Sequence, residues 1–284
     1  MRSKALRSFA DAATASATVH WILRASVWAC FVGHGMFGIR QKQEWVVFFE
    51  PFGIGPAIAT ALMPLIGLVD ITVGYLALLR PTRAVFMYAA LWGTFTGLLR
   101  PLVGLSVLET FERAGNVGPS LALLLGTGTA AILSQPVIYN LADPARQRRI
   151  TWLLSATTFL LLLGHGGLAA LGKPQLLQHW SALGVVQPDA AGLAFVRAIG
   201  YGEMAAAGLV LLWPSRPLCL AIVGWKLFTE SLFVVAGAPI WEVVERCGSY
   251  GAPLALFVVL AYRASDSVTR NEFVPVTSPE RSPA

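Results

Sequence analysis

The stretch at residues 109–118, ETFERAGNVG, decides the fold because the chain contains it twice. Its copy is EVVERCGSYG at residues 242–251. Each copy holds two carboxylates, one arginine and two glycines, and each lies between one long apolar run and the next. We therefore interpret the chain as two copies of one unit, each with the same polar connection.

Other residues repeat at nearly constant spacing. His34 and His165 are 131 positions apart, whereas Glu109 and Glu242 are 133 positions apart. A duplication keeps a fixed spacing wherever no loop has changed length, so one two-residue change in a loop explains both values. Further pairs at these spacings are Lys42 and Lys173, Gly53 and Gly184, Asp70 and Glu203, Trp92 and Trp225, and Arg113 and Arg246.

The composition indicates a lipid environment. The chain is 56% hydrophobic and 13% charged, with a mean hydropathy of +0.65, which leaves too little polar surface for a water-soluble globule of this size. A bilayer core requires about 20 largely apolar residues per helix. Eight segments are candidates, at about residues 21–39, 54–79, 84–105, 119–139, 151–171, 193–213, 217–240 and 251–262.

We therefore predict an all-α integral membrane protein with eight transmembrane helices, arranged as two parallel four-helix repeats. An even number of spans inserts both copies in one orientation, which gives a pseudo-twofold axis along the membrane normal. The last segment is short, so either Arg263 snorkels or the helix starts before Gly251. The expected parts are a cytoplasmic N-terminal segment (1–20), the first repeat (21–141), a cytoplasmic linker (142–150), the second repeat (151–262) and a disordered cytoplasmic tail (263–284).

The basic residues alternate between the two sides of the predicted membrane. Clusters of Arg and Lys precede the first segment and follow the second, fourth, sixth and eighth. The positive-inside rule then places both termini in the cytoplasm and both acid–arginine connections outside, as expected in a bacterial-type cytoplasmic (inner) membrane. No removable signal peptide is apparent. No basic patch suited to nucleic acid accompanies the net charge of +6, so the partners expected are the lipid bilayer and other membrane subunits.

Two motifs together resemble a known family. Gly33-His34-Gly35 near the outer end of a span, followed by Lys42 and three further spans, is similar to the DoxX-like family of four-span membrane proteins, here as a tandem fusion. The Glu-x-x-Glu-Arg-x-Gly-x-x-Gly stretch resembles the connection after the third span in some members. The resemblance implies a component of a membrane redox system linked to quinone. We keep two alternatives, a non-catalytic accessory subunit of a larger membrane complex and a proton-coupled small-molecule carrier.

The histidines are candidates for binding a cofactor. His34 and His165 have glycines on both sides, which would let a flat ligand approach. Such a pair could ligate haem iron or hydrogen-bond a quinone carbonyl. The alternative is that each histidine is hydrogen-bonded inside the protein, to Glu112 or Glu245.

A second group of candidates lies near the middle of the bilayer. Glu203, Lys226 and Glu230 are expected to neutralise one another, because an isolated charge there costs a few kcal/mol. Asp70 has no such partners in the first repeat, so we expect it to be protonated, bonded to Thr94, Thr96 or Trp92, or paired with Lys226. The group is interpreted either as a proton or substrate site or as an ion-paired core. Where the second repeat has Lys226 and Glu230, the first has Gly93 and Gly97.

The repeated connection itself is interpreted as a structural motif that holds the turn into the last span. Carboxylates three residues apart share one face of a helix end, and the arginine of each copy can neutralise them. We expect no metal site there. Arg100 is predicted to pair with Glu109 or to snorkel, and Cys30 and Cys219 to be buried hydrophobic residues. No catalytic motif assigns a reaction. The motif residues are Glu109, Glu112, Arg113, Glu242, Glu245 and Arg246.

Overall fold

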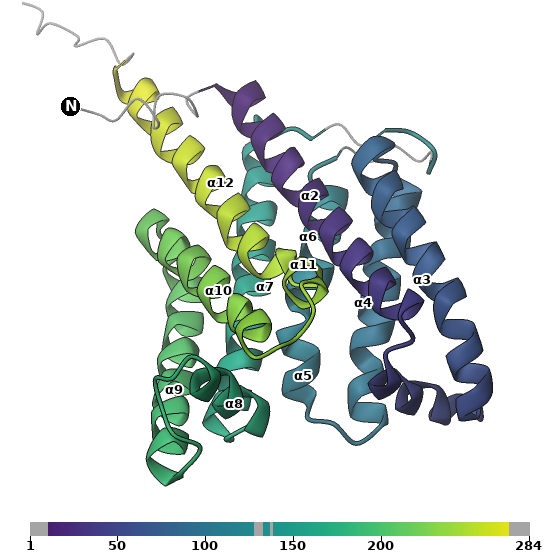
Figure 1. Cartoon of the computed structure of the whole chain (residues 1–284). Coiled ribbons are helices and arrows are strands. Elements are labelled where there is room, and N and C mark those ends of the chain that lie inside the picture. Colours follow the sequence, from purple (N-terminus) through teal and green to yellow (C-terminus); the bar gives the residue numbers. More distant parts are fainter. Residues whose placement is uncertain (1–10, 128–132, 137–138, 273–284) are drawn as a thin grey trace, which may run out of the picture.

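The computed structural model describes residues 11–127, 133–136 and 139–272. These residues form helices with short connections, and the one β-type pairing among them is an isolated bridge between Thr82 and Pro136. The all-helical architecture predicted from the sequence is confirmed. The helices, of which η1 is a 3₁₀ helix, are α2 (Ala12–Ile39), η1 (Gln43–Phe52), α3 (Pro56–Leu79), α4 (Arg83–Leu102), α5 (Val107–Glu112), α6 (Ala114–Leu125), α7 (Pro144–Ala170), α8 (Pro174–Ala182), α9 (Ala190–Leu212), α10 (Arg216–Val235), α11 (Trp241–Glu245) and α12 (Cys247–Glu272) (Figure 1).

Five helices of the described part are long and apolar enough to cross a membrane, namely α2, α3, α7, α9 and α10. α3 and α9 turn large apolar side chains outward, including Leu65, Leu68, Leu209 and Leu212. Water-soluble monomers rarely expose so much contiguous apolar surface, so these faces suit lipid. α2 and α7 are instead mostly buried inside the protein. The chain thus has the helices of a multi-pass membrane protein, with α2 and α7, which carry His34 and His165, at its centre.

The two central helices begin earlier than the sequence predicted. α2 starts at Ala12 and α7 at Pro144, where the expected starts were residues 21 and 151. An aspartate precedes each helix, and its side chain accepts hydrogen bonds from the first free backbone N–H groups. Such a cap is a strong helix start, and proline is well suited to the first helical position. Most of the predicted linker at 142–150 therefore forms the first turns of α7.

The fourth predicted span differs most from the structure. Where residues 119–139 were expected to form one helix, α6 begins at Ala114 and ends at Leu125. Its 12 residues rise about 18 Å, which is shorter than a bilayer core of about 30 Å. The helix ends where the ring of Tyr139 packs on Gly126, since a Cβ there would lie 1.9 Å from a ring carbon. Residues 133–136 then lie beside the turn from α3 to α4, where Ala84 donates to the Leu133 carbonyl.

The last helix is longer than predicted at both ends. It starts at Cys247, so the prediction of a start before Gly251 is the one that agrees with the structure. α12 continues to Glu272, where the sequence favoured a disordered tail from residue 263. After Pro253 this helix contains neither glycine nor proline. It therefore lacks the residues that most strongly disfavour a helix. The rest of the predicted tail, residues 273–284, lies outside the described part.

The neighbouring helices pack closely through glycines. α2 lies along α3, and α7 lies along α9. A Cβ on Gly35 would lie 2.6 Å from the carbonyl oxygen of Gly67, and one on Gly166 would lie 2.7 Å from that of Gly200. No larger residue fits either contact, because the neighbour is backbone and cannot move aside. The two contacts join positions that correspond at the spacing of the sequence repeat.

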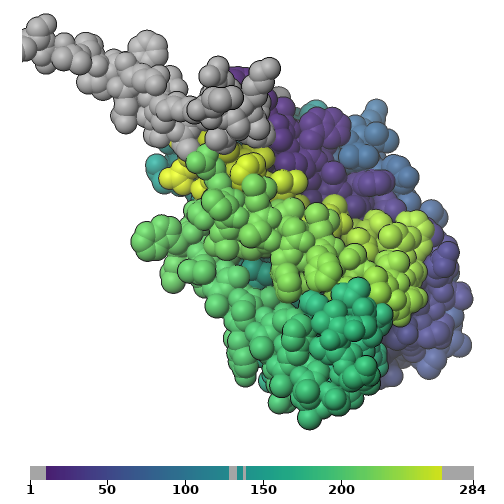
Figure 2. Space-filling view, turned by 60° about the vertical axis from the view of Figure 1, so that its left-hand side comes forward, coloured from purple at the N-terminus to yellow at the C-terminus, as the bar shows by residue number. Residues whose placement is uncertain are grey.

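We call residues 11–141 the first half and residues 142–272 the second half. The halves interlock, because α5 of the first half packs on α7 and α11 of the second half packs on α2. The start of α2 and the end of α12 lie at one end of the bundle, and η1, α5 and α8 lie at the other, which we call the loop end (Figure 1). Figure 2 shows the second-half helices, in green, covering one face of the molecule.

Candidate functional site

Ion pairs between the two halves occupy the loop end. The repeated connections and the two matched lysines take part, and the four closest of these pairs each join one half to the other. The arginines were expected to neutralise carboxylates of their own copy; instead each bonds most closely to the other copy, and only Arg246 also approaches its own, with Nε 3.6 Å from Glu242. The pairs are Lys42 with Glu242 (2.6 Å), Lys173 with Glu109 (2.7 Å), Arg113 with Glu245 (2.5 Å) and Arg246 with Glu112 (2.9 Å).

The glycines of the motif allow this exchange. A Cβ on Gly248 would lie 1.7 Å from the carbonyl oxygen of Gly115, so the two backbones touch where the halves meet. Gly33 and Gly164, each next to a histidine, also touch backbone of the other half: a Cβ on Gly33 would lie 2.4 Å from the backbone nitrogen of Glu245, and one on Gly164 would lie 2.2 Å from that of Glu112. Burial raises the pKa of the Glu112 carboxyl, but the nearby Arg246 and Lys173 outweigh it and hold that pKa well below its usual range. The repeated connection is thus a lock between the halves.

Each histidine bonds to an acid on the neighbouring helix. Nδ1 of His34 lies 2.7 Å from Oδ2 of Asp70, and Nδ1 of His165 lies 2.5 Å from Oε2 of Glu203. The partners predicted for the histidines, Glu112 and Glu245, were wrong, because the short α5 and α11 direct those carboxylates toward arginines. The acids at the repeat positions 70 and 203 lie within reach instead. Both histidines keep Nε2 outside these bonds, and a haem or quinone role for them stays a prediction.

Glu203 and Asp70 differ in whether they reach the matched tryptophan of the next helix. Glu203 also accepts a hydrogen bond of 2.5 Å from Nε1 of Trp225. Asp70 is one methylene shorter, and its Oδ1 and Nε1 of Trp92 both lack a hydrogen-bond partner among the described residues. None of the partners predicted for Asp70, which were Thr94, Thr96, Trp92 and Lys226, bonds to it. The first half therefore leaves an indole N–H unused where the second half does not.

The predicted cluster of Glu203, Lys226 and Glu230 divides into two parts. Lys226 lies 2.9 Å from Glu230, one turn along α10, and both side chains are buried. Glu230 also lies 3.6 Å from Nε of Arg246. Glu203 forms no ion pair with Lys226 in the described part of the chain, because His165 and Trp225 hold its two oxygens. The deep acids therefore belong to different networks, one with histidine and one with the lock.

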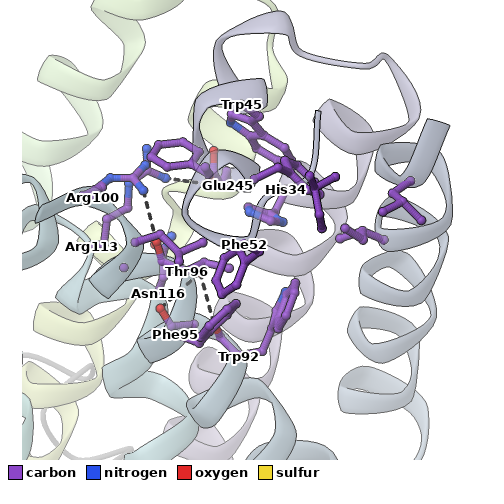
Figure 3. A pocket seen from close by; sticks show the side chains of 18 residues that line it. His34, Trp45, Phe52, Trp92, Phe95, Thr96, Arg100, Arg113, Asn116 and Glu245 are labelled. Carbon is purple, nitrogen blue, oxygen red and sulfur yellow. Dashed lines mark hydrogen bonds and ion pairs between the residues drawn. The ribbon is translucent and has the colours of Figure 1, made fainter. Parts of the chain in front are cut away.

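A cavity of about 320 Å³ lies in the first half, toward the loop end (Figure 3). η1 closes it on one side, and α3 and α4 form other walls. Six aromatic residues line it: Trp45, Phe48, Phe49, Phe52, Trp92 and Phe95. The polar residues in its wall include His34, Thr96, Arg100, Arg113, Asn116 and Glu245, the last of which comes from the second half.

Small residues on α4 create this space. Gly93 and Gly97 line the cavity where the second half has Lys226 and Glu230. The corresponding region of the second half, beside His165 and His179, retains only about 10 Å³. The sequence contained the signal, since glycines had replaced bulky charged residues, but we had expected the site on the charged side. At these matched positions the structure has open space in the first half. The second half has a different space of about 310 Å³, an apolar groove lined by Glu203 and Trp225 among others.

Arg100 is buried rather than snorkelling, with only 8% of its surface exposed. Its guanidinium carbon lies 5.3 Å from the centre of the Phe48 ring, and its Nε is 3.8 Å from Glu109. In the second half, Phe233 stands at the position of Arg100 and His179 at that of Phe48. These two rings pack with their centres 4.3 Å apart. Arg100 thus adds a cation to the cavity wall that its counterpart does not have.

Two of the cysteine predictions are confirmed, since Cys30 and Cys219 are buried and unpaired. Comparison of the chain with protein-family models, curated proteins and solved structures returns no match. The DoxX-like resemblance therefore remains a prediction from the motifs, and the function is inferred from the site itself.

Proposed function

We propose that this protein is a membrane redox component that binds the head group of a quinone-type ligand in the first-half cavity. The observation that carries the proposal is the cavity of about 320 Å³ with six aromatic side chains in its wall. Ligand pockets begin at about 300 Å³ and combine mostly apolar walls with a few polar groups. A planar ring with carbonyl oxygens suits such a lining.

The polar groups provide donors for those oxygens. Aromatic walls stack on a flat ring, and Nε1 of Trp92 has no protein acceptor in the described part. His34 lines the same cavity and is backed by Asp70. A carboxylate that bonds Nδ1 fixes the orientation of the imidazole ring, so His34 would be held in place to hydrogen-bond the ligand. Reduction of a quinone takes up protons as well as electrons, and the electrons would come from a redox partner in the membrane.

The membrane arrangement belongs to the same proposal. We infer eight crossings, α2, α3, α4 and α6 in one DoxX-like unit and α7, α9, α10 and α12 in the other, related by a pseudo-twofold axis. The exchanged ion pairs and the matched glycine contacts support the repeat. The short α6 is compatible with a crossing because residues 133–136 reach the turn between α3 and α4. Both termini would lie in the cytoplasm of a bacterial-type cell, with the cavity in the outer half of the inner membrane.

The ligand would enter from the lipid. Phe52 on η1 and Phe95 on α4 lie at the cavity rim with ring centres 6.0 Å apart, and 53% and 42% of their surfaces are exposed. These two rings belong to the apolar outer face rather than to a polar surface. A quinone that is dissolved in the bilayer therefore meets the rim directly.

The test is ligand recovery and binding in mild detergent. We expect quinone in an organic extract of the purified protein, and quenching of tryptophan fluorescence when menadione, a neutral naphthoquinone, is added. Gly97→Leu should fill the cavity and abolish the quenching, since a Cβ at Gly97 meets Thr110 only at an ordinary 3.7 Å. The matched control is Gly224→Leu on α10, where a Cβ meets nothing within 4 Å.

Equal quenching in both glycine variants would show that menadione merely dissolves in the detergent, and the proposal would fail. A quinone-free protein that migrates with other subunits on a native gel would instead favour the accessory-subunit alternative. Transport that is lost in Glu203→Gln would favour the carrier alternative.

A further inference from the structure

The first-half cavity carries a positive charge that the protein itself does not neutralise closely. The lock and the deep pair use five carboxylates and five cations, each pair 2.5 to 2.9 Å apart. Arg100 is a sixth cation in the same layer. Among the described residues, its one ion-pair partner is Glu109, which lies 3.8 Å away and already accepts from Lys173 at 2.7 Å.

The donors of Arg100 are also poorly used. Its Nε has no hydrogen-bond partner among the described residues, and Nη1 reaches only the carbonyl oxygen of Thr96 at 3.4 Å. The side chain is buried and lines the cavity. A buried charge without a close partner costs free energy, so a ligand that brings a negative charge would stabilise this site. Two other acids lie nearby. Glu245 lines the cavity but bonds to Arg113 at 2.5 Å, and Asp70 bonds to His34 and is not part of the cavity wall.

The second half has no cation at the position that corresponds to Arg100. There Phe233 replaces Arg100, and the guanidinium of Arg246 covers the ring at 4.3 Å while it bonds to Glu112. Beside His179 and Leu232 the space is only about 10 Å³, so Phe233 faces no open cavity. The larger space of the second half, about 310 Å³, is lined in the described part of the chain by Glu203, Trp225 and apolar residues and contains no cation. The extra cation therefore accompanies the aromatic cavity of the first half.

We propose that the first-half cavity selects an anionic ring, such as an ionised hydroxyquinone or an aromatic carboxylate, and that Arg100 is the specificity-determining residue. The inference rests on the proposed quinone-type function and narrows its ligand class. The guanidinium can donate two parallel hydrogen bonds to an ionised oxygen or a carboxylate. The aromatic walls hold the ring beside it.

Three ring probes of similar size test this. They are menadione, which is neutral; lawsone, the hydroxylated naphthoquinone, which is ionised at neutral pH; and naphthoate, which is anionic but no quinone. We expect the full-length protein to bind lawsone about ten- to hundredfold more tightly than menadione, the range for a hydrogen bond to a charged group. Arg100→Met should remove this preference, and Arg100→Lys should keep part of it. Arg40→Met, an exposed charge outside the cavity wall, is the control that leaves it unchanged.

The outcomes separate the two proposals. Equal binding of both quinones without naphthoate would overturn the anionic preference and keep the quinone function. Binding of both anions without menadione would support the role of Arg100 and overturn the neutral-quinone function. A lawsone preference that persists in folded Arg100→Met would show that Arg100 does not determine the specificity. Binding of no probe would overturn both proposals.

Discussion

The two halves of the molecule share their framework at the loop end but differ in what lies beneath it. In both, a histidine bonds to an acid on the next helix, and a loop helix from the other half packs beside it. Beneath this layer the first half has an aromatic cavity of about 320 Å³ beside His34, whereas the space beside His165 and His179 is only about 10 Å³. The second half is open elsewhere, in an apolar groove of about 310 Å³ beside Glu203 and Trp225. The shared contacts are those that hold the halves together, and the differing ones are those that a ligand would touch.

The difference shows how two halves with a shared framework can differ at matched positions. Lys226 and Glu230 occupy the space beside the lock in the second half and connect α10 to the lock through Arg246. Gly93 and Gly97 make no such connection and leave the aromatic cavity open.

The largest expected effect comes from the contact between Gly115 and Gly248. Gly248→Ala should prevent recovery of folded protein, because its Cβ would overlap the Gly115 carbonyl oxygen at 1.7 Å and cost more than about 3 kcal/mol. Gly115→Ala should be milder, with its nearest contact at 3.0 Å. The yield of folded protein in detergent checks the first variant, and thermal unfolding in detergent checks the second. If the two variants unfold within a few degrees of the wild type, the backbone contact between the halves is not formed.

Glu230→Gln tests the packed half. It leaves Lys226 buried without its one ion-pair partner, and breaking a buried pair in this way costs about 3–5 kcal/mol. The double variant Lys226→Met with Glu230→Gln should recover at least half of that loss, because no lone charge remains. Chemical denaturation in detergent gives both values. A double variant that is less stable than Glu230→Gln would contradict the pairing.

The matched tryptophans should respond differently to the same substitution. Trp225→Phe removes the hydrogen bond to Glu203 and should cost about 1.5–3 kcal/mol, the range for bonds to a charged group. Trp92→Phe should cost less, since its N–H has no protein acceptor in the described part. However, it should weaken ligand binding in the first half. Equal losses of stability in the two variants would show that Glu203 and Asp70 do not differ in reach.

The smallest effect concerns acidity at the loop end. Burial, and next the charge of Arg246, lower the pKa of His179 to about 4 from its ordinary 6.5. The unfolded chain then binds a proton more readily than the folded one, so this stability is complete above pH 6.5 and is lost as the pH falls toward 4. His179→Phe, which copies Phe48 of the first half, should flatten the melting temperature over this range. An unchanged pH profile would rule out His179 as the cause.

Much of the helical framework could be predicted from apolar runs and matched spacings, because helix length and internal repeats are local properties of the sequence. The helix starts at Ala12 and Pro144 were missed although Asp11 and Asp143 are ordinary caps. The sequence pattern did not reveal the short α6, since its end depends on the ring of Tyr139 packing on Gly126.

The site was harder to predict, because partners depend on how the halves meet. His34 and Asp70 were both candidates, but their contact became visible only when α2 lay along α3. The exchange of Arg113 and Arg246 between the halves follows from three-dimensional packing that no spacing encodes. The sequence shows that Gly93 and Gly97 stand where the second half has charged residues. It does not show that a cavity results, because a missing side chain leaves a cavity only when its surroundings do not collapse into the space.

Under the proposed four-helix repeat, the ion pairs between the halves have a consequence for the origin of the chain. A single four-helix unit would lack the other unit's Glu-Arg connection, and its histidine helix would be left uncovered. Such a unit would have to assemble as a dimer. Joining two units in one polypeptide makes the partner permanently available at a high effective concentration. It also allows the two copies to differ in sequence, so that one can lose its buried charges while the other retains them. A symmetric dimer has no such freedom, since every substitution in it occurs twice.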